Sequence, residues 1–142
     1  MSRSIDWLLV AVMALGAAFP MIHLSFYMYG PRIEAALFPP VWRLEASQRR
    51  CEGDDQIVEG RVVKNRGVFR ELTVTSGSTR IEWQALDQPS RAPADRPPGE
   101  TVLGLRLAGN CDRPFSLHTV HDASHDLWSL RQTWGPFNED DG

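Results

Sequence analysis

The amino-acid sequence predicts a mainly β protein, a small immunoglobulin-like antiparallel β-sandwich preceded by one N-terminal transmembrane α-helix. Two observations predict this fold class. Residues 7–30 contain no Asp, Glu, Lys or Arg, whereas residues 51–137 contain short runs rich in Val, Thr, Leu and Phe that are separated by turn signals. A chain of 142 residues has room for one small domain besides the apolar stretch.

The apolar stretch has the length of a membrane span. A helix needs ~20 apolar residues to cross ~30 Å of hydrocarbon, and residues 7–29 supply slightly more. Pro20 lies inside the stretch and predicts a kink. Aromatic residues stand at both ends, as in interfacial belts: Trp7, Phe26, Tyr27 and Tyr29.

A cleaved signal peptide and the core helix of a soluble domain are the two alternatives to an anchor. Arg3 provides a short basic region, and small residues ending at Ala18 suit a signal peptidase. The apolar run nevertheless continues well beyond Ala18, which favours an uncleaved anchor. Several arginines follow the stretch, so a bare charge count would leave the domain in the cytoplasm, but long domains translocate largely regardless of charge.

The two cysteines decide the expected topology. Cys51 precedes the first strand-like run and Cys111 follows the strongest one, so both are expected at strand ends. A disulfide between them would close a loop of about 60 residues and contribute about 4 kcal/mol. The alternative is two unrelated buried thiols. Since a disulfide indicates an oxidising compartment, we expect a bacterial inner-membrane protein with a cytoplasmic N-terminus and a periplasmic domain.

The chain divides into four expected parts. Residues 1–30 form the anchor, and residues 31–50 form a membrane-proximal segment with a short amphipathic helix, "RIEAALF", between prolines. Residues 51–137 form the β-sandwich, and residues 138–142 form a disordered acidic tail. This arrangement holds the domain close to the lipid bilayer.

About six strands are expected within the domain. Ile81, Trp83 and Ala85 alternate with polar residues, which is typical of a half-buried antiparallel strand with Trp83 in the core. The proline-rich segment 87–100 cannot pair inside a sheet, so we expect it to cross over the surface. The other expected strands contain "DQIVEGRVVKN", "VFRELTVTS", "TVLGLRLAGN", "PFSLHTV" and "LWSLRQTW".

The order of these segments resembles that of small uncharacterised bacterial and phage single-pass membrane proteins with a Cys-containing β domain. The shared features are "PPV" after the span, "RPPGE" before a Leu-rich strand that ends in Cys111, and "WGPF" near the C-terminus. The resemblance implies the topology and carries no implication for chemistry.

A histidine cluster is the first candidate site. His118, His121, Asp122 and His125 would share one face if the segment were helical, and could then bind a divalent metal. The segment "FSLHTV" looks extended, however, which would place His118 and His121 on opposite faces. Surface histidines in a loop are therefore the favoured interpretation.

His23 is the second candidate, because it is the only ionisable residue inside the span. Such a residue is a candidate ligand of a tetrapyrrole, a quinone contact or a hydrogen-bond partner of another helix. The alternative is an interfacial histidine without a partner.

Trp128 and Trp134 form the third candidate, because tryptophan is enriched at the centre of protein interfaces. Core positions are favoured for both, since a sandwich of this size needs its large side chains inside.

The functional expectation rests partly on missing signatures. The net charge of -3 gives no basic surface for nucleic acid, and the sequence contains no phosphate loop, nucleophile elbow or HExxH motif. We therefore expect a non-enzymatic accessory or scaffold subunit whose partners are other membrane-protein subunits. The larger assembly would be a membrane or envelope complex, and bioenergetic complexes belong to this class. The alternatives are a periplasmic metal-binding or catalytic domain that uses the histidine cluster, and a phage-encoded envelope protein.

Overall fold

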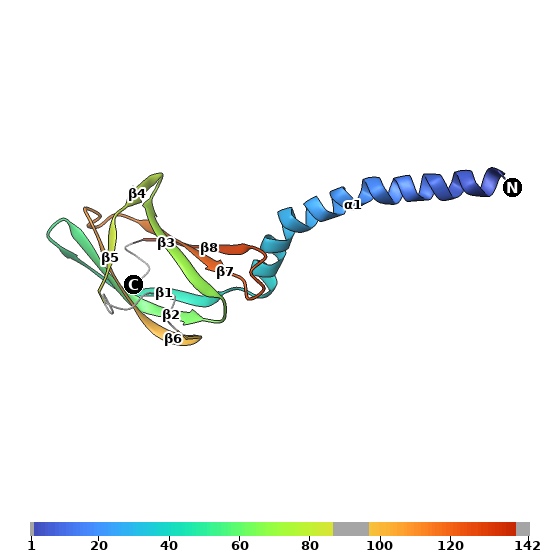
Figure 1. Cartoon of the computed structure of the whole chain (residues 1–142). Coiled ribbons are helices and arrows are strands. Elements are labelled where there is room, and N and C mark those ends of the chain that lie inside the picture. The colour runs from blue at the N-terminus through green and yellow to red at the C-terminus, as the bar shows by residue number, and fades with distance from the viewer. Residues whose placement is uncertain (1, 87–96, 139–142) are drawn as a thin grey trace.

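The computed structural model describes residues 2–86 and 97–138, and it confirms the predicted fold class (Figure 1). One long helix, α1 (Ser2–Leu37), leads into two four-stranded sheets that pack face to face. The strands are β1 (Val41–Glu52), β2 (Asp55–Lys64), β3 (Val68–Ser76), β4 (Thr79–Ile81), β5 (Trp83–Ala85), β6 (Gly99–Leu107), β7 (Phe115–Asp122) and β8 (Ser129–Phe137).

α1 extends away from the sandwich and is long and apolar enough to span a membrane. The part from Trp7 to Leu37 has this character, and almost all of its large apolar side chains are exposed in the single chain. Pro20 and Pro31 both lie inside the helix, and Figure 1 shows the helix bending before it reaches the sandwich. Proline removes a backbone hydrogen bond and bends a helix, so these two residues account for the bend.

The two sheets have the strand orders β1-β2-β6-β5 and β4-β3-β7-β8, and every pairing is antiparallel. At one edge, β4 and β5 are separated by Glu82 alone and carry the chain from one sheet to the other. At the opposite edge, the amide of Gln132 on β8 exchanges two hydrogen bonds of 3.0 Å with the backbone of Val41 on β1. The sandwich is therefore connected at both edges.

The core consists of the inward-facing residues of both sheets. β7 alternates strictly between buried and half-buried positions, as a strand with one face on the core should. Ile81 is buried, and Trp83 packs against the core and donates a 3.0 Å hydrogen bond from Nε1 to the Leu72 carbonyl. The partial burial of Trp83 agrees with the core position expected for it, and its hydrogen bond satisfies the polar atom of the ring.

The boundaries expected before the sandwich differ from the structure. α1 continues to Leu37, so the expected short helix is its C-terminal end, and the expected start of the domain at residue 51 lies inside β1. β1 pairs with β2 along its whole length but contains two register irregularities, which interrupt its inside-outside alternation. Residues 2–86 and 97–138 contain eight strands where about six were expected in the domain. The crossover at 87–96 and the tail at 139–142 lie outside the described residues.

Candidate functional site

The predicted metal-binding histidines do not come together. β7 is extended, so His118 lies on its outer face and His121, only 2% exposed, lies on its inner face. His125 follows in the loop before β8, and Asp122 pairs with Arg70. The helical arrangement that a metal site would need is therefore wrong, because the segment pairs as a strand between β3 and β8.

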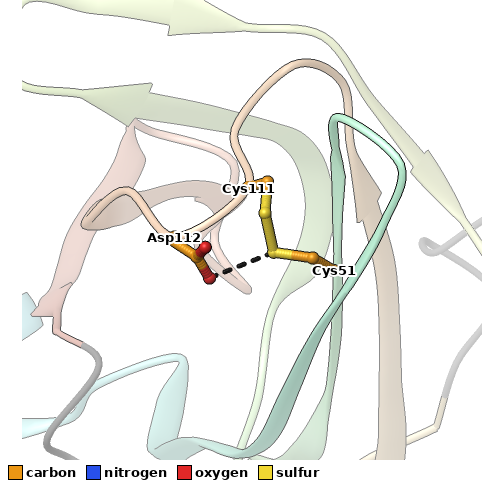
Figure 2. Close-up of side chains that lie close together, drawn as sticks. All are labelled: Cys51, Cys111 and Asp112. Atoms are coloured by element: carbon orange, nitrogen blue, oxygen red, sulfur yellow. Dashed lines mark hydrogen bonds between the residues drawn. A yellow bond between two sulfur atoms is a disulfide. The ribbon is translucent and has the colours of Figure 1, made fainter.

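The cysteine pair is confirmed as a disulfide (Figure 2). Cys51 at the end of β1 is bonded to Cys111 in the loop after β6, 60 positions later. Asp112 Oδ1 lies 3.1 Å from Cys51 Sγ, a close contact rather than a true hydrogen bond because a disulfide sulfur carries no proton. Within 2–86 and 97–138, these three residues are the one set of ligand-type side chains gathered closely enough for a metal, but bonded cysteines offer no thiolate.

His23 lies on the exposed surface of α1. Its ring lies between two aromatic rings of the same helix, with centroids 6.1 Å from Phe19 and 4.9 Å from Tyr27. Among the described residues its ring contacts come from α1 alone, so lipid or another helix would cover the rest of its exposed surface in a membrane. Its interaction with a cofactor or a helix stays a prediction.

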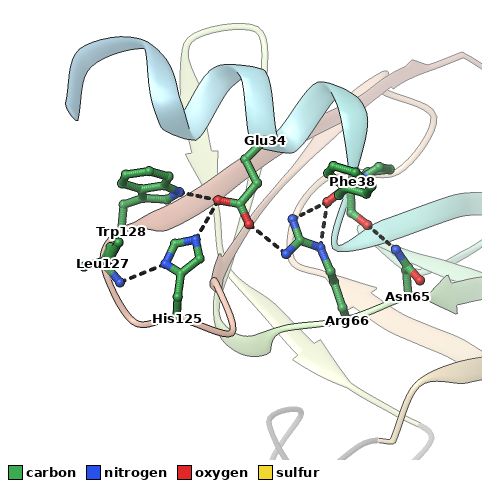
Figure 3. Close-up of polar contacts among 8 residues, drawn as sticks. Glu34, Phe38, Asn65, Arg66, His125, Leu127 and Trp128 are labelled. Atoms are coloured by element: carbon green, nitrogen blue, oxygen red, sulfur yellow. Dashed lines mark hydrogen bonds and ion pairs between the residues drawn. The ribbon is translucent and has the colours of Figure 1, made fainter. Parts of the chain in front are cut away.

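The most elaborate polar site lies where α1 meets the sandwich (Figure 3). We name Glu34, Arg66, His125 and Trp128 the junction cluster. Glu34 stands near the end of α1, Arg66 in the turn between β2 and β3, and the other two residues in or beside the loop between β7 and β8. Three segments that are far apart in the sequence thus converge on one carboxylate.

Glu34 accepts three strong contacts. Arg66 Nη1 lies 2.7 Å from Oε1, while Trp128 Nε1 and His125 Nε2 lie 2.6 Å and 2.9 Å from Oε2. The side chains of Glu34 and Arg66 are only 14% and 24% exposed, so this ion pair is much less hydrated than a surface pair. Charge-assisted hydrogen bonds in such surroundings are the strong ones.

The hydrogen bonds of His125 assign different roles to its two ring nitrogens. Its Nδ1 accepts a 3.1 Å hydrogen bond from the backbone N–H of Leu127, so that nitrogen carries no proton. Nε2 must then be the protonated nitrogen that donates to Glu34. The Glu34 carboxylate is balanced by the charge of Arg66.

Arg66 also ties the cluster to the connection between α1 and β1. Its Nε and Nη2 donate to the Phe38 carbonyl at 2.8 Å and 2.6 Å, and its guanidinium lies 5.8 Å from the centroid of the Phe38 ring. Beside it, Asn65 Nδ2 donates to the Pro39 carbonyl at 3.1 Å, and Asn65 N donates to the Pro40 carbonyl at 2.7 Å. The turn after β2 therefore binds the three residues that connect helix and strand.

Trp128 packs against the last turns of α1. Its ring makes edge contacts with Phe26 and Tyr27, with centroids 5.0 Å and 6.2 Å apart. Gly30 makes this approach possible, because a Cβ at that position would lie 2.8 Å from the indole. Trp134, by contrast, is partly buried against the core. The expected partner surface of Trp128 is thus covered, within this chain, by its own helix.

The junction cluster can hold two elements together. His125 and Trp128 were candidates for separate sites, a metal site and an interface, although a surface loop and the core were favoured for them, whereas Glu34 and Arg66 were missed. One signal was available: Glu34 is the first acidic residue after a long uncharged stretch, followed closely by apolar residues. No local pattern links it to residues that lie 32 and more positions away.

The comparison with known proteins finds no relative of this chain. No protein-family model matches the chain, and no curated protein or solved structure is significantly similar to it. The resemblance to small bacterial and phage membrane proteins therefore stays a prediction.

Proposed function

We propose that this protein is a non-enzymatic accessory subunit, anchored by α1 in a bacterial inner membrane, whose periplasmic sandwich docks onto a larger membrane or envelope assembly. The junction cluster is the observation that carries the proposal. A domain that merely needs a membrane anchor can hang on a flexible linker, whereas here a partly buried ion pair, an indole and a histidine join the helix to the sandwich. Such a joint keeps the two parts in one orientation.

A fixed orientation is useful when both parts contact the same partner. If α1 packs against other helices in the bilayer, the junction cluster determines which face of the sandwich meets the partner outside it. His23 supports helix contact, because a polar side chain in a span is most stable when another helix offers a hydrogen bond. The disulfide supports an oxidising compartment for the sandwich.

The test is the native size of the full-length chain, extracted from its own membranes in mild detergent, with mass spectrometry of the proteins that accompany it. We expect migration within a large assembly with defined companions. His23→Leu should weaken that association, while Glu100→Gln, a change at an exposed ion pair on the sandwich, should leave it intact. Migration of the wild-type chain as one or two copies with a micelle would refute the proposal.

A further inference from the structure

A cavity of about 90 Å³ lies between the two sheets and is open to solvent on one side. Apolar side chains from both sheets form most of its wall, among them Val41, Leu44, Leu72, Leu103, Leu105 and Leu117. The cavity lies toward the α1 end of the sandwich, because its lining includes the first residue of β1, the last residue of β2 and the end of β7.

Two polar side chains lie in this wall without a hydrogen-bond partner. Thr119 and His121 follow each other on the inner face of β7 and are 5% and 2% exposed. Neither Thr119 Oγ1 nor His121 Nδ1 has a partner within the described residues; the third such buried atom there, Trp134 Nε1, belongs to a residue that does not line the cavity. Buried polar atoms are almost always hydrogen-bonded, so two neighbouring exceptions in the wall of one cavity indicate a site for a further group.

We propose that this cavity is a binding site for a small neutral amphiphile. Its apolar body would lie against the leucines, and its one hydrogen-bonding group would lie between Thr119 Oγ1 and His121 Nδ1. An alcohol fits this pair, because a hydroxyl both donates and accepts a hydrogen bond.

Charge and size restrict the ligand further. An ion would lose its hydration among the apolar side chains, and the one charged side chain in the wall, Lys64, already has an interaction of its own, so the ligand is expected to be uncharged. A cavity of about 150 Å³ holds benzene, so this smaller one accepts a body of about four carbons. Burial, together with the nearby Lys64 charge, lowers the pKa of His121 to about 4. The His121 imidazole is therefore uncharged near neutral pH and suits a neutral partner.

The test is a titration of the full chain in lipid nanodiscs with 1-butanol, followed by the ¹⁵N chemical shift of His121 Nδ1. We expect a saturable shift, and weaker binding of 1-chlorobutane, which has a similar body but no hydroxyl. Thr119→Val removes the hydroxyl without changing the side-chain shape. It should lower the affinity for 1-butanol about fivefold. Thr73→Val, on the outer face of β3, is the matched control and should bind 1-butanol as the wild type does.

Two results would overturn the proposal. One is the absence of a saturable shift with 1-butanol, which would mean that water alone satisfies Thr119 and His121. The other is equal affinity of the wild type for 1-butanol and 1-chlorobutane, which would mean that the two polar atoms take no part. The second comparison uses only the wild-type chain, so it holds even if Thr119→Val fails to fold.

Discussion

Replacing Glu34 with Gln should loosen the end of α1 from the sandwich. Gln has the shape of Glu, but it carries no charge and turns one of the two acceptor oxygens into an N–H₂ donor. At this position three donors converge, from Arg66, His125 and Trp128, so the new amide must face at least one of them. The substitution thus removes attraction and adds a clash of donors at a nearly unchanged volume.

The magnitude follows from the burial of the pair. Removing one partner of a buried ion pair costs about 3–5 kcal/mol, and a hydrogen bond to a charged group contributes about 1.5–3 kcal/mol. Arg66 is 24% exposed and keeps its bonds to the Phe38 carbonyl, so the lower part of this range applies. We expect the free energy of opening the junction to fall by about 2–3 kcal/mol, which is about 30- to 150-fold in the opening equilibrium.

Hydrogen exchange on the full chain in nanodiscs measures this opening directly. The Phe38 amide, which donates to the Glu34 carbonyl, and the Leu127 amide, which donates to His125, report on the two sides of the junction. Both should exchange faster in Glu34→Gln, whereas Glu100→Gln, at an exposed pair with Arg61, should change exchange only slightly. Equal protection in both variants would show that the cluster does not hold the helix to the sandwich.

Three further predictions follow from the same structure. Gly30→Ala should push the Trp128 ring away from α1 and speed amide hydrogen exchange at the junction. Gly16→Ala, at a position with open space around it, should not change this exchange. Identical exchange rates in the two variants would contradict the close packing. Reduction of the single disulfide should lower the free energy of unfolding by about 4 kcal/mol, measured by denaturant titration with and without reductant; an unchanged midpoint would contradict this. Burial, helped by the Lys64 charge, lowers the pKa of His121 to about 4. The unfolded chain therefore binds the proton more readily than the folded chain. The free energy of unfolding should fall by up to about 1.4 kcal/mol per pH unit as the pH falls from 6.5 toward 4. His121→Phe should lose this part of the pH dependence, and an unchanged profile would refute it.

The sequence predicted those elements whose pattern is local and regular. A charge-free stretch predicted α1, because that pattern depends on neighbouring residues alone. The alternation from Ile81 to Ala85 predicted the inward-facing side chains, but the single expected strand was wrong, because Glu82 separates β4 from β5 and the two lie in different sheets. β1 was missed before residue 51 because its register irregularities place several exposed residues in succession, which hides the two-residue period.

The junction cluster could not be predicted from the sequence for a different reason. Glu34 contacts residues 32, 91 and 94 positions away, and these contacts exist only after both sheets have formed. A sequence shows a carboxylate, an imidazole and an indole, but their pairing depends on which loops the sheet topology brings to one end of the sandwich. His125 and Trp128 were recognised as noteworthy, and their common partner was not.

The short connection between α1 and β1 limits how far the sandwich can reach. Only residues 38–40 separate Leu37 from Val41, and three residues span at most about 10 Å even when extended. The 12 residues of β1 add about 40 Å. Any surface that the strands of the sandwich touch must therefore lie within roughly 50 Å of the point where the helix ends.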